Sequence, residues 1–80
     1  MFIVYIITSL KDPSKHYVGF TKDLDRRLIA HNARKSLFSR KYSPWKIESY
    51  ITFTDERKAI AFEKYLKKGS GHAFLTKHLI

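Results

Sequence analysis

Residues 2–20 form the stretch FIVYIITSLKDPSKHYVGF, which decides the fold. Its first part, residues 2–8, is an unbroken run of apolar and β-branched side chains, typical of a strand buried on both faces. Residues 9–15 contain an Asp-Pro-Ser cluster that favours a turn. Residues 16–20 predict a second strand, so the chain is expected to open with a β-hairpin. Gly19 inside that strand indicates close approach of another backbone segment or a ligand.

Beyond the hairpin, the pattern predicts a helix, a connection and a strand. Helical spacing extends from about residue 23 to 32 or 33, with Thr21 or Asp23 as the N-cap. Residues 34–44 are expected to form a polar, basic connection. The clearest strand follows, because apolar and polar residues alternate with a period of two. Its mostly apolar face is predicted to hold Trp45, Ile47, Ser49, Ile51 and Phe53.

The remaining residues predict two helices. Thr54 can cap the first of these, which is expected to run to about Lys68. Gly69 can then take the left-handed closing position, and Ser70 can cap a short final helix over about residues 71–79. The order ββαβαα predicts a single α+β domain over residues 1–80, with an antiparallel sheet packed by about three helices.

The charge of the chain points to its partner. Sixteen Lys and Arg residues against seven Asp and Glu residues give a net charge of +9. Nucleic acid is the leading candidate partner because basic side chains neutralise phosphates, and an anionic membrane surface is the second. The sequence has no cysteine, which fits a reducing compartment. It also has no apolar run of membrane-spanning length, so we expect a cytoplasmic protein without a membrane partner.

Two charged residues of the first predicted helix lie beside its apolar stripe. At about 100° per residue, Arg27 and His31 fall one turn apart next to Leu24 and Leu28, whereas Arg26 falls on the far side. Singly, Arg27 is best interpreted as a snorkelling side chain and His31 as a half-buried, hydrogen-bonded ring. Together with the residues that follow, the pair favours a functional site.

Glu63 is the least ordinary position in the chain. On a helical wheel it falls within the apolar face of its helix, between Ala59 and Ile60. A buried carboxylate is costly unless it is paired or holds a cation. Two interpretations therefore stay open: a structural ion pair, for example with Arg27, and a metal ligand.

Two tyrosines in the hairpin add phenols to this set. Tyr5 shares a strand face with Ile3 and Ile7, and Tyr17 shares one with Gly19. A buried phenol needs a hydrogen-bonding partner. From spacing alone, ordinary packing is the simpler interpretation of both rings.

The segments Ile3-Val4-Tyr5 and Tyr17-Val18-Gly19, whose tyrosines are twelve positions apart, resemble the signature of the GIY-YIG nuclease superfamily. Later segments are similar to its small single-domain branch, whose members resemble the excinuclease subunit that makes the incisions in nucleotide excision repair. These segments are residues 44–46, residues 61–67 and residues 69–71, while residues 21–28 with His31 and Asn32 are similar to the first helix of the family. The resemblance covers essentially the whole chain. It implies a three-stranded antiparallel sheet flanked by helices.

The resemblance also implies metal-assisted hydrolysis of a phosphodiester bond. Tyr5 and Tyr17 correspond to the signature tyrosines, Arg27 to the catalytic arginine, and Glu63 to the glutamate that holds Mg²⁺ or Mn²⁺. His31 corresponds to a helix position that holds histidine or tyrosine in relatives. By this resemblance Tyr17 accepts the proton of the attacking water while Tyr5 or His31 orients it, and His31 stays open as the alternative base.

The expected partner is nucleic acid, and DNA in preference to RNA. Sequence specificity should be low and the chain a monomer or weak homodimer, acting in DNA repair or processing. Backbone phosphates should be held mainly by basic side chains. The predicted nucleic-acid contacts are Gly19, Lys22, Arg34, Lys35, Arg40, Lys41, Lys46 and Lys67, with Lys64 and Lys68 nearby.

The sequence departs from the family pattern at three points. Ile3 stands where the signature has glycine, Phe20 stands where repair-type relatives often have lysine, and the late asparagine of homing-type relatives is missing, since Asn32 is the only one. These departures keep a second hypothesis open, a nucleic-acid-binding module that has lost turnover. A third, a basic domain that binds membranes or proteins, is disfavoured because the helices carry core stripes.

Overall fold

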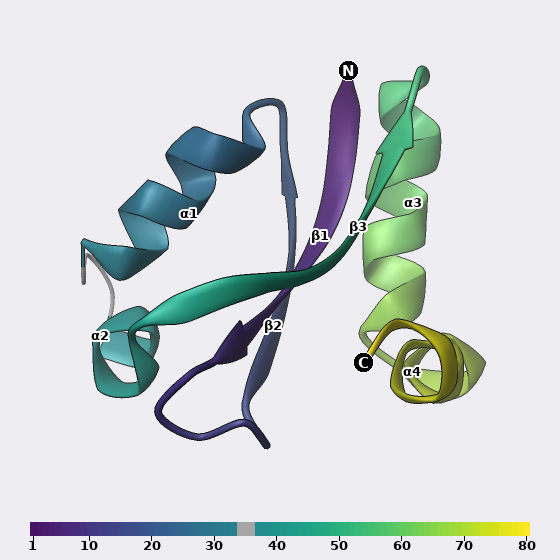
Figure 1. Ribbon diagram of the computed structural model, residues 1–80. Helices are drawn as coiled ribbons and strands as arrows, with labels where there is room; N and C mark the ends of the chain where they lie inside the picture. Colours follow the sequence, from purple (N-terminus) through teal and green to yellow (C-terminus); the bar gives the residue numbers. More distant parts are fainter. Residues whose placement is uncertain (34–36) are drawn as a thin grey trace.

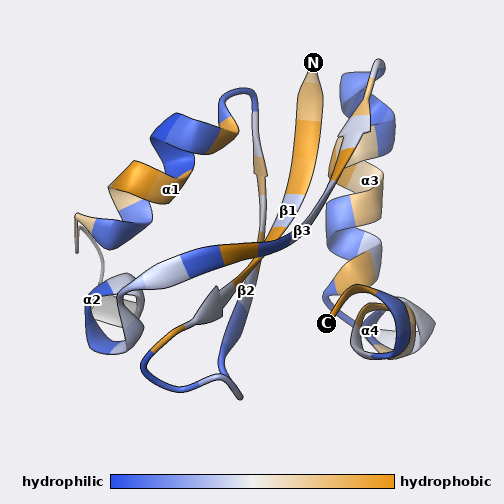
Figure 2. Ribbon diagram, in the orientation of Figure 1, coloured by the Kyte–Doolittle hydropathy of each residue, from blue (hydrophilic) through white to orange (hydrophobic). Residues whose placement is uncertain are grey.

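A computed structural model, which describes residues 1–33 and 37–80, has a three-stranded antiparallel sheet with helices on both faces (Figure 1). The strands are β1 (Phe2–Ser9), β2 (His16–Thr21) and β3 (Trp45–Phe53), in the spatial order β2-β1-β3. β1 is central and is covered by helices on both sides, which explains its continuous apolar sequence. Figure 2 shows hydrophobic colours along most of β1. The predicted α+β class is confirmed.

The helices form two layers around the sheet (Figure 1). One layer contains α1 (Leu24–Asn32) and α2 (Leu37–Tyr42). The opposite layer contains α3 (Glu56–Leu66), α4 (Gly69–Phe74) and a π-helical turn, η1 (Leu75–Leu79). The two helical layers cover opposite faces of the sheet. The short edge strand β2 therefore has one set of residues on its α1 face and another on its α3 face.

Helix α2 lies where the sequence predicts only a connection, so the prediction for residues 34–44 is wrong over residues 37–42. Six residues are too few to show a helical period, and a helix this short takes its stability from tertiary contacts. Here those contacts are hydrogen bonds: Ser9 Oγ donates to the carbonyl of Tyr42, and Trp45 Nε1 donates to the carbonyl of Ser39.

The observed helix starts refine the predicted caps. Asp23 caps α1 and accepts a hydrogen bond from the Arg26 amide, as one of the two predicted alternatives. Helix α3 is capped by Asp55, whose carboxylate accepts from the Arg57 amide at 2.8 Å, rather than by Thr54. Aspartate and threonine are both favourable N-cap residues, so the choice between Thr54 and Asp55 depends on where β3 ends.

The start of the last helix also differs from its prediction. Helix α4 begins at Gly69, directly after Lys68, and not after a cap at Ser70. Gly69 has a φ of 61°, which confirms the left-handed conformation predicted for it.

A β-bulge divides β3 between the two faces of the sheet. Ile6 of β1 pairs with Ser49, whereas Ile7 pairs with Ile47, so Glu48 is the extra residue. Trp45 and Ile47 consequently pack on the α1 side. Farther along β3, Phe53 packs on the α3 side. The prediction of one apolar face along β3 is therefore wrong, because a one-residue shift moves later side chains to the opposite face.

Candidate active site

The candidate site is centred on Tyr5, which is fully buried in the central strand. Tyr5 pairs with Gly19 of β2, and its ring lies across the Gly19 backbone. A Cβ atom at residue 19 would overlap the phenol oxygen and lie 2.8 Å from Cε1 of Tyr5. The close approach predicted at Gly19 is therefore made by the Tyr5 ring. A phosphate contact at Gly19 stays a prediction.

A line of hydrogen bonds leads from Tyr5 to helix α2. The Tyr5 hydroxyl lies 2.9 Å from Nε2 of His31, and His31 Nδ1 lies 2.9 Å from Oγ of Ser39. His31 and Ser39 are both buried, at 9% and 4% exposure. Sequence reasoning did not find Ser39, because it lies in the helix that the sequence does not reveal and serine is common in exposed connections.

Arg27 extends from α1 to the phenol of Tyr5. Its residue is exposed as a whole, but its guanidinium is close enough to lower the pKa of Tyr5 by its charge and as a hydrogen-bond donor. Arg26 instead projects into solvent with a side chain 87% exposed, 4.0 Å from Asp23. The two adjacent arginines thus have the different positions that helical spacing predicts.

Burial holds Tyr5 and His31 in their neutral forms. It raises the pKa of Tyr5 to about 12, with the Arg27 charge acting in the opposite direction. Burial also lowers the pKa of His31, and the Arg27 charge lowers it further. The Tyr5 oxygen accepts from the Arg27 guanidinium, and the two ring nitrogens of His31 each face a hydroxyl group, that of Tyr5 at Nε2 and that of Ser39 at Nδ1.

Tyr17 is the accessible member of the aromatic cluster. Its ring centroid lies 4.9 Å from that of His31 and 6.3 Å from that of Tyr5. Tyr17 is half-buried and lines a surface pocket, unlike the fully buried Tyr5. Tyr17, Arg27 and Glu63 all act electrostatically on the Tyr5 phenol, so the fold brings together residues from β1, β2, α1 and α3.

Glu63 forms an ion pair, but with a different partner from the one considered above. Its carboxylate, 19% exposed, lies 3.0 Å from Nζ of Lys67 one turn later in α3. A helical pair of this kind contributes only about 0.3–0.5 kcal/mol, so it does not hold the carboxylate strongly. The observed ion pair is with Lys67 and not with Arg27. A buried ion pair with Arg27 therefore does not account for the position of Glu63.

The donor set fits a divalent cation bound largely by water and substrate. Mg²⁺ commonly takes one or two carboxylates from a protein and completes its octahedron with waters and phosphate oxygens. Glu63 provides one carboxylate, which acts electrostatically on the Tyr5 phenol as Tyr17 and Arg27 do. Among the described residues, no three His, Asp or Glu side chains gather into a cage.

The predicted phosphate contacts are scattered around this centre. Lys22, Arg40, Lys41 and Lys46 are exposed, and Lys67 is also exposed beside Glu63. Lys22 lies 3.6 Å from Glu56 and over the ring of Phe2, so its charge is partly engaged. Arg34 and Lys35 lie outside the described residues.

Comparison with known families agrees with this arrangement. A family model described as the GIY-YIG catalytic domain matches residues 1–75 of the 80. The chain belongs to the GIY-YIG family. The resemblance predicted from the two signature strands is thereby confirmed, and the GIY-YIG family is one of nucleases that act on nucleic acids and generally use divalent metals. No curated protein matches the chain significantly. No helix among the described residues could cross a membrane.

Two residues that depart from the GIY-YIG pattern pack against the hydrophobic core. Ile3 is half-buried and packs in the apolar cluster around Tyr5. Phe20 packs in the opposite cluster and stacks on Phe2, with centroids 6.4 Å apart and planes at 7°. Both side chains therefore contribute to the core of this GIY-YIG domain.

Proposed function

We propose that this GIY-YIG domain is a metal-dependent endonuclease that hydrolyses phosphodiester bonds in DNA with low sequence specificity. The supporting observation is the convergence of Tyr17, Arg27 and Glu63 on the buried Tyr5–His31 pair. A phenol, a guanidinium and a carboxylate beside one another match the three tasks of hydrolysis: accepting a proton, neutralising phosphate charge and holding a cation.

Arg27 and Glu63 would act on the phosphate. Glu63 would hold Mg²⁺ or Mn²⁺, which supplies a Lewis acid that stabilises negative charge on phosphate oxygens when bound. Arg27 can donate two parallel hydrogen bonds to phosphate oxygens, and its guanidinium is accessible at the surface. Binding the phosphate would draw Arg27 toward substrate without removing the Tyr5–His31 hydrogen bond.

Tyr17 is the better candidate for accepting the proton of the attacking water. His31 is buried and both of its ring nitrogens are hydrogen-bonded, so a water molecule cannot reach either one in this arrangement. Tyr5 is also inaccessible and holds its own proton strongly, as its raised pKa shows. Tyr5 and His31 would position Tyr17 and Arg27.

The substrate assignment rests on charge and on the family. The net charge of +9 favours any phosphate backbone, and the exposed lysines supply contacts that do not depend on sequence. The likeness to the excinuclease subunit supports DNA over RNA and a role in repair or processing. We propose a monomer or weak homodimer that cleaves one strand per encounter.

A nuclease assay with matched variants tests the proposal. Labelled single-stranded, duplex and branched DNA and RNA are incubated with Mg²⁺, Mn²⁺ or EDTA. Arg27→Ala and Glu63→Gln should each reduce cleavage at least 100-fold, an effect of the size expected for a lost charge-stabilising group. Arg26→Ala and Glu56→Gln change the same charges elsewhere and should retain activity.

Other outcomes would decide against catalysis. If wild-type protein binds DNA but yields no metal-dependent products, the chain is a binding module and the enzymatic proposal fails. Cleavage that is equal in Arg27→Ala and Arg26→Ala would show that Arg27 does not stabilise the transition state.

A further inference from the structure

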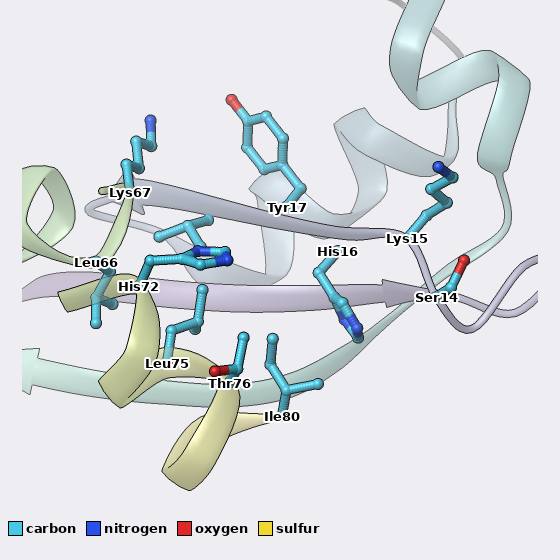
Figure 3. A pocket seen from close by; sticks show the side chains of 11 residues that line it. Ser14, Lys15, His16, Tyr17, Leu66, Lys67, His72, Leu75, Thr76 and Ile80 are labelled. Atoms are coloured by element: carbon cyan, nitrogen blue, oxygen red, sulfur yellow. The ribbon is translucent and has the colours of Figure 1, made fainter. Parts of the chain in front are cut away.

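A pocket of about 630 Å³ lies at the free edge of β2 (Figure 3). Its lining comes from the start of β2, the end of α3, and α4 with η1. Tyr17 and Lys67 line it, and Figure 3 shows both side chains projecting toward the same side of the strand. The pocket therefore adjoins the candidate active site at Tyr17 and at the partner of Glu63.

The walls of the pocket combine an apolar floor with a polar rim. The floor is formed by Val18, Leu66, Leu75 and Ile80. The rim is formed by Ser14, Lys15, His16, Lys67, His72 and Thr76. Pockets that bind organic ligands typically have volumes of roughly 300–1,000 Å³ and this combination of apolar walls with a few polar groups. The two lysines make the rim attractive to a ligand that carries phosphate.

His16 is held in a defined orientation at the rim. Its Nδ1 lies 3.0 Å from Oγ1 of Thr8, which donates its only proton to the Glu48 carboxylate at 2.9 Å. Thr8 must therefore accept from His16, so Nδ1 carries the proton of the neutral ring and Nε2 is an acceptor. His72 comes from the opposite wall on α4. Imidazole rings are surfaces on which unpaired bases stack.

We propose that this pocket binds one unstacked base of the substrate strand, next to the phosphate held by Arg27 and Glu63. The proposal rests on the proposed function and deepens it by naming the state of the substrate. The base occupies the apolar floor, with His16 and His72 beside it, while Lys15 and Lys67 hold the adjoining phosphates.

The size and position of the pocket favour a base over a free ion. Inorganic phosphate would gain nothing from the four aliphatic side chains of the floor, and its charge would be poorly solvated there. A base has both an apolar face and polar edges, and the nucleic-acid strand connects it directly to the active site. Because a paired base must first be unstacked, single strands and mismatched duplexes should bind better than regular duplexes.

The test measures base placement without cleavage. Glu63→Gln protein in EDTA is titrated into single-stranded DNA that carries 2-aminopurine at successive positions, since this base brightens when it leaves the stack. We expect a several-fold rise in fluorescence at one position and at least tenfold weaker binding to the matched regular duplex. Equal fluorescence at all positions, or no binding, would overturn the proposal.

Two pocket-filling variants and a control locate the effect. Thr76→Trp and Ile80→Trp should each weaken binding about tenfold and abolish the fluorescence rise, whereas Ala73→Trp, in the adjoining α4 but outside the lining, should change binding less than twofold. Circular dichroism confirms folding of each variant. Unchanged binding and fluorescence in both folded pocket variants would refute the site.

The design separates this proposal from the nuclease proposal. A position-specific fluorescence rise in a protein whose wild type cleaves nothing would support the base pocket and refute the endonuclease. Metal-dependent cleavage with no such rise would support the endonuclease and refute the base pocket. Binding of free 2-aminopurine nucleotide, but not of the strand, would identify a nucleotide-binding site and overturn the assignment to substrate DNA.

Discussion

Replacing Gly19 by alanine tests the packing on which the candidate site depends. The added Cβ would overlap the Tyr5 hydroxyl and Cζ and lie 2.8 Å from Cε1. Tyr5 cannot move freely, because it is fully buried in the central strand and hydrogen-bonded to His31. Something in the cluster must therefore shift.

The expected cost combines two effects. Forcing an extra methyl into a packed core costs about 1–3 kcal/mol. Displacing the phenol from His31 costs a further ~0.5–1.5 kcal/mol for the lost hydrogen bond. In a strand, alanine is more favourable than glycine by only about 0.5–1 kcal/mol of folding free energy, so the steric overlap dominates. We expect Gly19→Ala to lower the free energy of unfolding by about 2–3 kcal/mol, or the Tm by roughly 10–20 °C.

Urea unfolding in a double-mutant cycle provides the assay. Tyr5→Leu removes the ring atoms that the new Cβ would meet, and in that background Gly19→Ala should be neutral or slightly stabilising. The coupling energy should therefore approach the full penalty. A Gly19→Ala loss below about 0.5 kcal/mol, or equal losses in both backgrounds, would refute the role assigned to the Tyr5 ring.

Four further predictions concern hydrogen bonds and protons. Ser39→Ala should destabilise the fold by about 1–3 kcal/mol in urea unfolding, because the variant leaves His31 Nδ1 buried without its hydroxyl partner. Since the folded pKa of His31 lies below 6.5, the unfolded chain binds more protons in acid, so stability should fall below about pH 6.5 and His31→Gln should flatten that slope. Conversely, the pKa of Tyr5 rises from 10.0 to about 12, so stability should fall as the pH rises through this window, an effect that unfolding of Tyr5→Phe would lack. Asp55→Ala should cost about 1 kcal/mol of stability by thermal unfolding, and Thr54→Ala less than about 0.5 kcal/mol. If Thr54 were the cap, Thr54→Ala would be the more destabilising of the two substitutions.

Local patterns predicted much of the fold because their causes are local. The apolar run of residues 2–8, the alternation of residues 45–53 and the glycine after α3 each reflect a periodicity or a backbone preference. Helix α2 and the bulge at Glu48 were not predictable in this way. Each depends on contacts with β1, which is far away in the sequence, and neither leaves a period of its own.

Within the candidate site, helical spacing separated Arg27 from Arg26 and singled out Glu63, because the position of a side chain around a helix follows from its number. Spacing could not identify the partner of Glu63, since Lys67 and Arg27 both carry a positive charge that can pair with a carboxylate. It also could not identify Ser39, which is eight residues from His31 in sequence and meets it only because α2 packs against α1.

The sequence by itself determined the types of the strands and of every helix except α2, the basic charge and, through its two signature strands, the GIY-YIG family. Only the tertiary structure decided that Tyr5 and His31 are buried as a neutral hydrogen-bonded pair while Tyr17 and Arg27 are accessible. The pocket at the edge of β2 likewise exists only in three dimensions. Burial and pKa depend on the summed surroundings of a group, and those come from segments that the sequence does not place side by side.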